Sequence, residues 1–396
     1  MSEDFEVSGP EISRRKLLQY GLAAGGAFAL GGSGLESASA AFARLGAGGP
    51  FKGPVSKLKP YNPNAPAGQA PPSSIPRSMA WVAETDTAYW LSYKIGLEQG
   101  AKDSGISFAW SDSNGDSAAD VAKLNEYVQK GVGVLCGVPV GGVAPQTPIQ
   151  LNALKSGALV VWLLEGPAIT VNTVNQYEAG YIQGKDAAEF IKKQMGGKAK
   201  VVYYNANQTS PALIPREQGA IAGLKTGGPG IDVVANIFNT PSVQTGNQKM
   251  VTLMQAHPDI DVVLGDDESV LGAYEAFKAA GKLSQVKYMS GINGSADALA
   301  VLGKGPYKAN YGFNFGQLGY AVGLQAGLWF QGKSIPMINV MSLVPMRSKA
   351  DIAVFNNSMN NPRSVYKKDH AKYLSFLGNI SYATRSNYVD FAPTVK

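Results

Sequence analysis

Three consecutive carboxylates follow one of the apolar runs of this chain. Asp266, Asp267 and Glu268 follow residues 260–264 after a single glycine, and a helical pattern starts with the third of them. Carboxylates at the end of a strand can form an acid–base pair, bind a metal, cap a helix or accept hydrogen bonds from a ligand. Consecutive residues on a turn diverge, and no second acidic or histidine motif accompanies these three. We therefore expect neither a catalytic residue nor a metal site, with an enzyme that uses these carboxylates as the alternative.

Other residues that commonly carry chemistry are scarce. The chain has 2 histidines, His257 and His370, and 1 cysteine, Cys136. Neither histidine is spaced from other possible ligands as in a metal site. The sequence therefore offers few residues from which a zinc site or a Ser–His triad could form. Cys136 lies inside an apolar run and is expected in the core. No cofactor is expected, and the net charge of +6 comes without the basic and aromatic runs of a nucleic-acid-binding protein.

From Met79 onward, apolar runs alternate with amphipathic stretches, which predicts parallel sheets flanked by helices. The 396 residues are enough for two cores, and the alternation occurs in two successive sets. We predict strands at 78–83, 106–110, 132–138, 159–164, 201–205, 233–238, 262–264 and 287–290. We predict helices at 88–104, 117–129, 180–194, 216–225, 246–256, 268–280 and 318–329, with a helix end at 150–155 and a helix start near 295.

The first 40 residues have the pattern of a targeting signal rather than of a folded element. Residues 13–19 read SRRKLLQ, a glycine-rich apolar segment runs from Tyr20 to Gly32, and the small-residue site Ala38-Ser39-Ala40 follows. The five glycines of that segment argue against an amphipathic helix, and its short length argues against a membrane anchor. The pattern resembles a twin-arginine export signal, so we expect a protein exported to the periplasm after removal of residues 1–40.

Composition divides the rest of the chain. Residues 41–78 are rich in proline and glycine and are expected to form a linker. We expect an N-terminal lobe from residues 79–175 plus 312–345 and a C-terminal lobe from residues 176–311. Residues 346–396 break the alternation and are expected to form an extension packed on one lobe.

Several of these segments share their order and spacing with one family. They read AETDTAYWLSYKIGLEQGAKDSG at 83–105, NQYEAG at 175–180, PREQGAIAGL at 215–224, and PDIDVVLGDDESVLGAYEAFKAAG at 258–281. Over residues 79–345 the set resembles type I periplasmic binding proteins of the ribose-binding kind.

The resemblance implies an α/β fold of two Rossmann-like lobes with parallel sheets joined by a hinge. It implies a non-catalytic, monomeric protein that captures a sugar, a polyol or a sugar derivative between its lobes by hinge closure. The implied partner is the permease of an ABC importer, and a protein serving a chemoreceptor is the alternative. Regulators that share this fold carry an N-terminal helix-turn-helix, a position taken here by the export pattern.

The resemblance also assigns residues of the first lobe to the ligand. Tyr89 and Trp90 match an aromatic pair that stacks on the ligand, and Asp86 or Thr87 matches a polar contact in the same loop. Glu165 follows the strand LVVWLL, where the family usually has an acid that accepts hydrogen bonds from hydroxyls. The alignment there is uncertain by one residue, so Leu164 is the alternative occupant.

In the second lobe, Arg216 matches an arginine whose planar fork can bind two ligand oxygens. Asp266 is expected to accept hydrogen bonds from the ligand, and Asp267 to share that role with helix capping. Glu268 is expected to be a solvated residue of the first helical turn.

Asn293, in SGINGS, and Phe313, in YGFNFG, complete the expected site. Here the sequence departs from the family, which usually has Asp at the position of Asn293, Gln near that of Phe313 and Asn at that of Asp266. These departures argue against a common pentose or hexose and favour a polyol, an unusual sugar, or a ligand with an aromatic or cationic group.

Overall fold

The computed structural model describes residues 50–51, 57–66, 68–206 and 213–390, so the expected export signal lies outside the described residues. In this part of the chain, seven strands form a first sheet in the order β13-β11-β5-β4-β3-β1-β2. Neighbouring strands are parallel except for the edge strand β13, which is antiparallel to β11. The strands are β1 (Ser78–Ala83), β2 (Ser107–Asp112), β3 (Val134–Gly137), β4 (Leu159–Leu163), β5 (Thr170–Val174), β11 (Ile338–Met341) and β13 (Leu374–Leu377).

The second sheet in the described residues has six strands in the order β12-β10-β9-β8-β6-β7. It too is parallel except at one edge, where β12 is antiparallel to β10. The strands are β6 (Ala199–Asn205), β7 (Ile231–Phe238), β8 (Val262–Asp266), β9 (Tyr288–Asn293), β10 (Tyr307–Phe313) and β12 (Leu343–Met346). Two mostly parallel sheets with interleaved helices confirm the predicted fold class.

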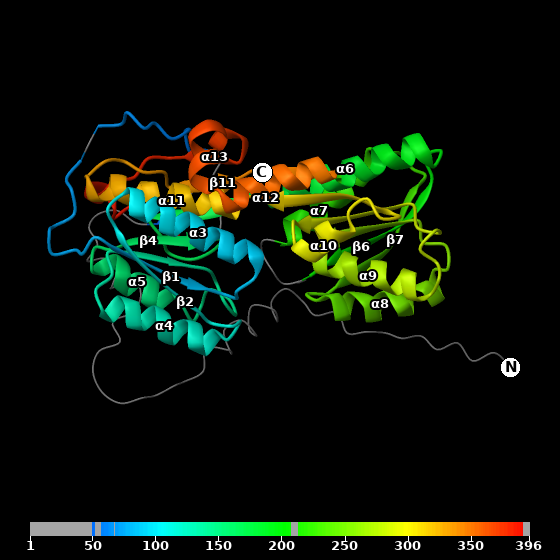
Figure 1. The fold of residues 1–396 in the computed structure, drawn as a ribbon, viewed down its shortest axis with the longest axis horizontal. Helices are drawn as coiled ribbons and strands as arrows, with labels where there is room; N and C mark the ends of the chain where they lie inside the picture. The colour runs from blue at the N-terminus through cyan, green and yellow to red at the C-terminus, as the bar shows by residue number, and fades with distance from the viewer. Residues whose placement is uncertain (1–49, 52–56, 67, 207–212, 391–396) are drawn as a thin grey trace, which may run out of the picture. The chain divides into compact units, whose positions relative to one another are not determined.

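Helices cover both faces of each sheet (Figure 1). On the first sheet, α3 and α11 lie on one face and α4 and α5 on the other; on the second sheet, α6 and α7 lie opposite α8 and α9. The helices are α3 (Ala88–Asp103), α4 (Ser117–Gln129), α5 (Thr147–Lys155), α6 (Gln176–Gln194), α7 (Leu213–Lys225), α8 (Val243–Ala256), α9 (Asp267–Ala279), α10 (Ala296–Val301), α11 (Phe315–Phe330), α12 (Lys349–Asn360) and α13 (Pro362–Asp369). None of them combines the length and the apolar composition that a membrane span requires.

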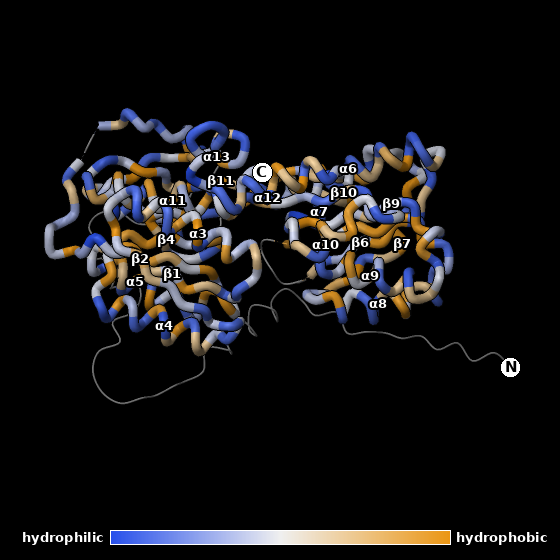
Figure 2. Tube along the Cα trace, in the orientation of Figure 1, coloured by the Kyte–Doolittle hydropathy of each residue, from blue (hydrophilic) through white to orange (hydrophobic). Residues whose placement is uncertain are grey.

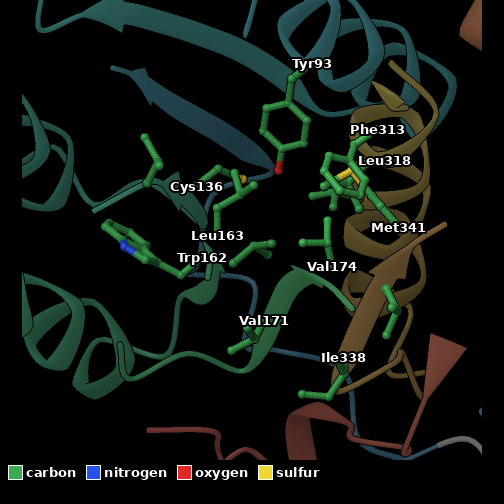
Figure 3. Close-up of a cluster of buried hydrophobic side chains, with 14 of the residues drawn as sticks. Tyr93, Cys136, Trp162, Leu163, Val171, Val174, Phe313, Leu318, Ile338 and Met341 are labelled. Atoms are coloured by element: carbon green, nitrogen blue, oxygen red, sulfur yellow. The ribbon is translucent and has the colours of Figure 1, made fainter. Parts of the chain in front are cut away.

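The inner strands supply most of the apolar interior, because they are buried on both faces, whereas the edge strands β2 and β7 are partly exposed. Figure 2 shows the apolar strands lying inside the more polar helices. Cys136 is fully buried in the first core, as expected from the sequence. Figure 3 shows part of this core, with Trp162 from β4, Val171 from β5 and Ile338 from β11.

Glycines let the helix pairs on one face of each sheet approach closely. A Cβ atom on Gly96 of α3 would lie 2.3 Å from the carbonyl oxygen of Gly316 at the start of α11. A Cβ atom on Gly184 of α6 would lie 2.0 Å from the carbonyl oxygen of Ala220 in α7. Any larger residue would therefore force either helix pair apart. Both lobes thus have a glycine where their two helices are closest.

In the described residues the chain passes between the sheets at four places. It leaves the first sheet after β5, returns at Asn314, leaves again between β11 and β12, and returns between β12 and β13. The sequence interpretation assigned residues 312–345 to the N-terminal lobe. In the structure, the last residues of that range belong to β12. This strand pairs with β10 and is therefore an edge strand of the second sheet.

The C-terminal segment contains regular structure where the sequence suggested no clear strands. Its strand β13 pairs with β11 at the edge of the first sheet. The proline-rich segment before β1 packs on this edge: Pro60 forms an isolated bridge with Leu377, and the Tyr61 amide donates to the Phe376 carbonyl at 2.9 Å. β13 therefore covers the edge of β11, and Pro60 and Tyr61 cover β13 in turn, which protects this edge from pairing with other chains.

Helix α12 contacts elements of both lobes. Its Phe355 is 1% exposed and lies against Gly294 and Gly312 of the second lobe. One turn later, Met359 Sδ accepts a hydrogen bond from Ser92 Oγ of α3 at 3.6 Å. The helix also packs on α11, so it belongs to the scaffold and links the two sheets.

Candidate ligand-binding site

A pocket of about 260 Å³ lies where the carboxyl ends of strands from both sheets meet. This is the edge at which open parallel sheets bind their ligands. Its volume is below the roughly 300–1,000 Å³ of drug-sized sites, so it suits a small molecule. The pocket is lined by the polar residues Gln176, Arg216, Asp266, Glu268 and Asn293, the aromatic residues Tyr89, Trp90, Phe313 and Phe315, and the aliphatic residues Leu163, Leu164, Val174, Ala206, Leu213 and Met341.

A buried ion pair is the centre of the polar side. Arg216, in the first turn of α7, donates from Nη1 to Asp266 Oδ1, and the two residues are only 4% and 3% exposed. Arg216 Nε also donates to Gln176 Oε1 at 2.8 Å, while Asp266 Oδ2 accepts from the Ala206 amide at 3.2 Å. A buried charge pair needs further hydrogen bonds to its remaining atoms, and these contacts supply them to Arg216 Nε and to Asp266 Oδ2.

Asn293 and Glu268 extend this polar network. The Asn293 side-chain oxygen accepts from Arg216 Nη1 at 3.5 Å. Glu268 is half-buried and lines the pocket, so its expected solvated position is wrong. Burial, together with the nearby Asp266 charge, raises the pKa of Glu268, and a hydrogen bond with the Asn293 side chain opposes that shift. Glu268 is not solvated as expected because the first turn of α9 faces the pocket rather than solvent.

Aromatic rings gather at the start of α3. The ring centroids of Tyr89 and Trp90 are 4.9 Å apart, and Phe315 lies 5.5 Å from the first and 5.1 Å from the second. Burial raises the pKa of Tyr89 to about 12, so its phenol stays protonated near neutral pH. On the other lobe, the Arg216 guanidinium lies 5.8 Å from the Phe313 ring centroid. A cation over a ring face is electrostatically favourable.

Leu164, and not Glu165, lines the pocket after β4. Leu164 has a φ of 67°, a left-handed conformation that is unusual for a residue other than glycine. Its amide donates to the Asn172 carbonyl at 2.8 Å, which fixes the turn. The alternative occupant named from the sequence therefore faces the pocket, and the carboxylate of the next residue does not.

Three more of the expected residues lie outside the pocket lining. Asp86 and Thr87 are exposed in the loop before α3. Asp267 is fully buried behind the pocket, where Oδ2 accepts from the Ser295 amide and Oδ1 from Asn310 Nδ2, both at 2.6 Å. It is the first residue of α9, and Asp266 occupies the N-cap position without a capping hydrogen bond, so the expectation that Asp267 caps this helix is wrong.

Burial and the neighbouring Glu268 charge raise the pKa of Asp267 to about 7. The two hydrogen bonds that it accepts oppose this shift without cancelling it. Because its oxygens already bond to the β9–α10 loop and to β10, Asp267 positions the loop that directly follows Asn293.

The structure thus brings together Tyr89, Trp90, Arg216, Asp266, Asn293 and Phe313 from the set expected from the sequence. The pocket residues that the sequence did not reveal are mostly apolar residues at the ends of strands, such as Val174 and Met341. Strand-end position was the signal that could have found them, but the strands β5 and β11 were not recognised.

The described residues offer no candidate metal centre, although they form other pockets. No group of three or more His, Cys, Asp or Glu side chains there could bind a metal ion. A wider surface pocket of about 610 Å³ lies over α3, α11 and α13. Three of its polar groups are bonded to one another, because Asp103 accepts from both Tyr320 and Arg363.

Comparison with known proteins places the chain in a family. Residues 79–333 match the periplasmic binding protein domain. The ribose import binding protein of Bacillus subtilis is 29% identical over 226 residues, which are 55% of this chain and 70% of that protein.

Solved structures with this fold align over a larger share of this chain. A twin-arginine translocation pathway signal protein from Burkholderia phytofirmans aligns with a TM-score of 0.63 and 20% identity, over 77% of this chain and 98% of that one. A protein from Mycobacterium smegmatis in complex with β-D-fucofuranose aligns with a TM-score of 0.62 and 18% identity, over 75% of this chain and 98% of that one. The two sheets, the pocket at their strand ends and the domain match together identify this chain as a member of the type I periplasmic binding proteins.

Proposed function

We propose that this protein is the solute-binding component of an ABC importer and captures a sugar, a polyol or a sugar derivative in the pocket described above. The observation that carries the proposal is the Arg216–Asp266 pair beside aromatic rings, at strand ends of both sheets. Charged acceptors and donors bond strongly to hydroxyl groups, and ring faces pack on the C–H face of a sugar.

The charge of the pocket favours a neutral ligand over an anion. Asp266 already neutralises Arg216, which leaves Glu268 as the remaining charged group on the lining. A carboxylate accepts hydrogen bonds from hydroxyls or from an amine and repels an anion. Micromolar affinity, about −8 kcal/mol, is within reach of a few such bonds and one ring contact.

Residues from both sheets line the pocket, so a bound ligand would contact both lobes at once. Such a ligand stabilises the closed arrangement of the hinge over the open one. Family members bind ligands and are not enzymes, which fits a role in delivery rather than catalysis. We propose that the protein acts as a periplasmic monomer and delivers its ligand to a permease.

The proposed export route is the twin-arginine pathway. Its support is the SRRKLLQ segment with the small-residue site at residues 38–40, and one protein of the same fold is described by that pathway.

A thermal-shift screen of sugars, polyols and small amines tests the proposed function. A ligand at 100 times its Kd stabilises the folded protein by about 2.7 kcal/mol, which raises the Tm by several degrees. We expect neutral polyhydroxy compounds to raise the Tm and simple anions such as acetate to leave it unchanged. A screen in which no sugar, polyol or amine raises the Tm would contradict the proposal.

A further inference from the structure

The two lobes contribute chemically different surfaces to the pocket. All pocket residues from the first sheet and its helix α3 are aliphatic or aromatic: Tyr89, Trp90, Leu163, Leu164, Val174 and Met341. The charged and amide side chains all come from α6, α7, α9 and the strand ends of the second sheet. We call the first set the apolar wall and the second set the polar wall.

The apolar wall consists of well-packed side chains. Leu163, Val174 and Met341 end β4, β5 and β11 and belong to the same buried cluster as Phe313 (Figure 3). Each of these four residues is less than 5% exposed. Leu163, Val174 and Met341 offer shape and dispersion contacts and provide no hydrogen-bond partner for a ligand. The members of the wall that have hydrogen-bonding groups are Tyr89 and Trp90, and the Trp90 indole already donates to Glu84 at 3.3 Å.

An ordinary sugar fits such a pocket poorly. It carries hydroxyl groups around its whole edge, whereas the strand-end residues Leu163, Val174 and Met341 and the neighbouring Leu164 cannot bond to them. A hydroxyl that meets the apolar wall loses its hydrogen bonds to water without replacement, and this lowers affinity by about tenfold or more. An apolar group at that position gains affinity instead, because it leaves water for an apolar surface.

We propose that the ligand is a small sugar or polyol in which an apolar substituent, an alkyl or alkylthio group, replaces one hydroxyl and lies on the apolar wall. The remaining hydroxyls bond to the polar wall at Asp266, Glu268 and Asn293. This inference rests on the proposed function and specifies its substrate class.

Leu164 is the residue that selects for the substituent. The turn after β4 fixes Leu164 at a φ of 67°, and this residue lines the pocket where the neighbouring carboxylate of Glu165 does not. Asn tolerates this backbone conformation better than Leu. The substitution Leu164→Asn therefore adds a hydrogen-bonding group to the apolar wall without straining the turn.

Two matched ligand pairs test the inference by calorimetry. The pairs are D-ribose with 5-methylthio-D-ribose and D-galactose with D-fucose, in which a single hydroxyl becomes a methylthio group or a hydrogen. We expect the apolar member of a bound pair to bind about tenfold more tightly to the wild-type protein. Leu164→Asn should bring that ratio close to one, and Val354→Asn, at a position 59% exposed on α12, should leave it unchanged.

The outcomes separate this inference from the proposed function. Equal binding within a pair, or tighter binding of the hydroxyl member, overturns the apolar-substituent inference and leaves sugar binding intact. An unchanged ratio in Leu164→Asn overturns the role of that residue. Failure of all four compounds to bind counts against the proposed function itself, and the inference fails with it.

Discussion

Arg216 and Asp266 show what single residues of this site do together. The sequence suggested that each would contact the ligand by itself. Arg216 was expected to donate hydrogen bonds to two ligand oxygens, and Asp266 to accept hydrogen bonds from the ligand. In the structure they are bonded to each other and buried, although they lie 50 positions apart in the chain. No local pattern predicts such a pair, because it depends on β6, β8 and α7 meeting at one strand end. The pair sets the charge of the polar wall and limits which ligands it accepts.

Asp267 is a single residue that should make the stability of the folded protein depend on pH. Its pKa is raised from 3.8 to about 7 in the folded protein, so the folded state binds a proton more tightly than the unfolded state. The stability from this proton is fully present below the unfolded pKa and is lost as the pH rises through about 7. We expect the Tm to fall between pH 5 and pH 7.5 in thermal melts followed by circular dichroism.

Two variants identify the source of that pH dependence. Asp267→Asn is neutral at every pH and should flatten the decrease in Tm between pH 5 and pH 7.5. Asp297→Asn, at an exposed position on α10, should keep the wild-type slope. The same slope in Asp267→Asn and in the wild-type protein would mean that other groups cause it. Asp120 is the leading candidate, since burial raises its pKa to about 6.

At the scale of elements, the sequence predicted the long helices and the apolar strands and missed the strands that contain buried asparagine. β5 reads TVNTV and β11 reads INVM. Their Asn172 and Asn339 bond to each other at 2.8 Å, and the first also donates to the Tyr93 hydroxyl at 3.1 Å. A polar residue in a short apolar run hides the signal of a buried strand. The pocket residues Val174 and Met341 were missed for the same reason.

Helix α12 supports the lobes in a way that a single substitution can test. Phe355→Ala removes a fully buried ring that lies against Gly294 and Gly312. A buried phenylalanine truncated to alanine typically costs about 3–5 kcal/mol, so the Tm should fall by several degrees. The neighbouring Val354→Ala, at an exposed position, should change the stability by less than about 0.5 kcal/mol. Similar melting curves for the two variants would show that α12 is not part of the cooperative fold.

At the scale of the whole molecule, the sequence predicted the class of fold and the approximate edge where a ligand would bind. It did so because the alternation of apolar and amphipathic segments depends on local periodicity. It did not predict the pairing of β12 with β10 or of β13 with β11, because antiparallel edge strands from a distant segment leave no local signal. The division of the pocket into an apolar and a polar wall depends on which strand ends of the two sheets meet, so it emerged only from the structure.

The central claim is that Asp266 and its partners bind a neutral polyhydroxy ligand. Calorimetric titration of the tightest ligand from the thermal-shift screen, with wild-type protein and Asp266→Asn, tests it most directly. We predict that Asp266→Asn binds at least about tenfold more weakly, because the buried Arg216 loses its counter-charge and the ligand loses an acceptor. Asp297→Asn should bind like the wild-type protein, and circular dichroism should show that all three are folded. Equal affinity of folded Asp266→Asn and wild-type protein would contradict the account.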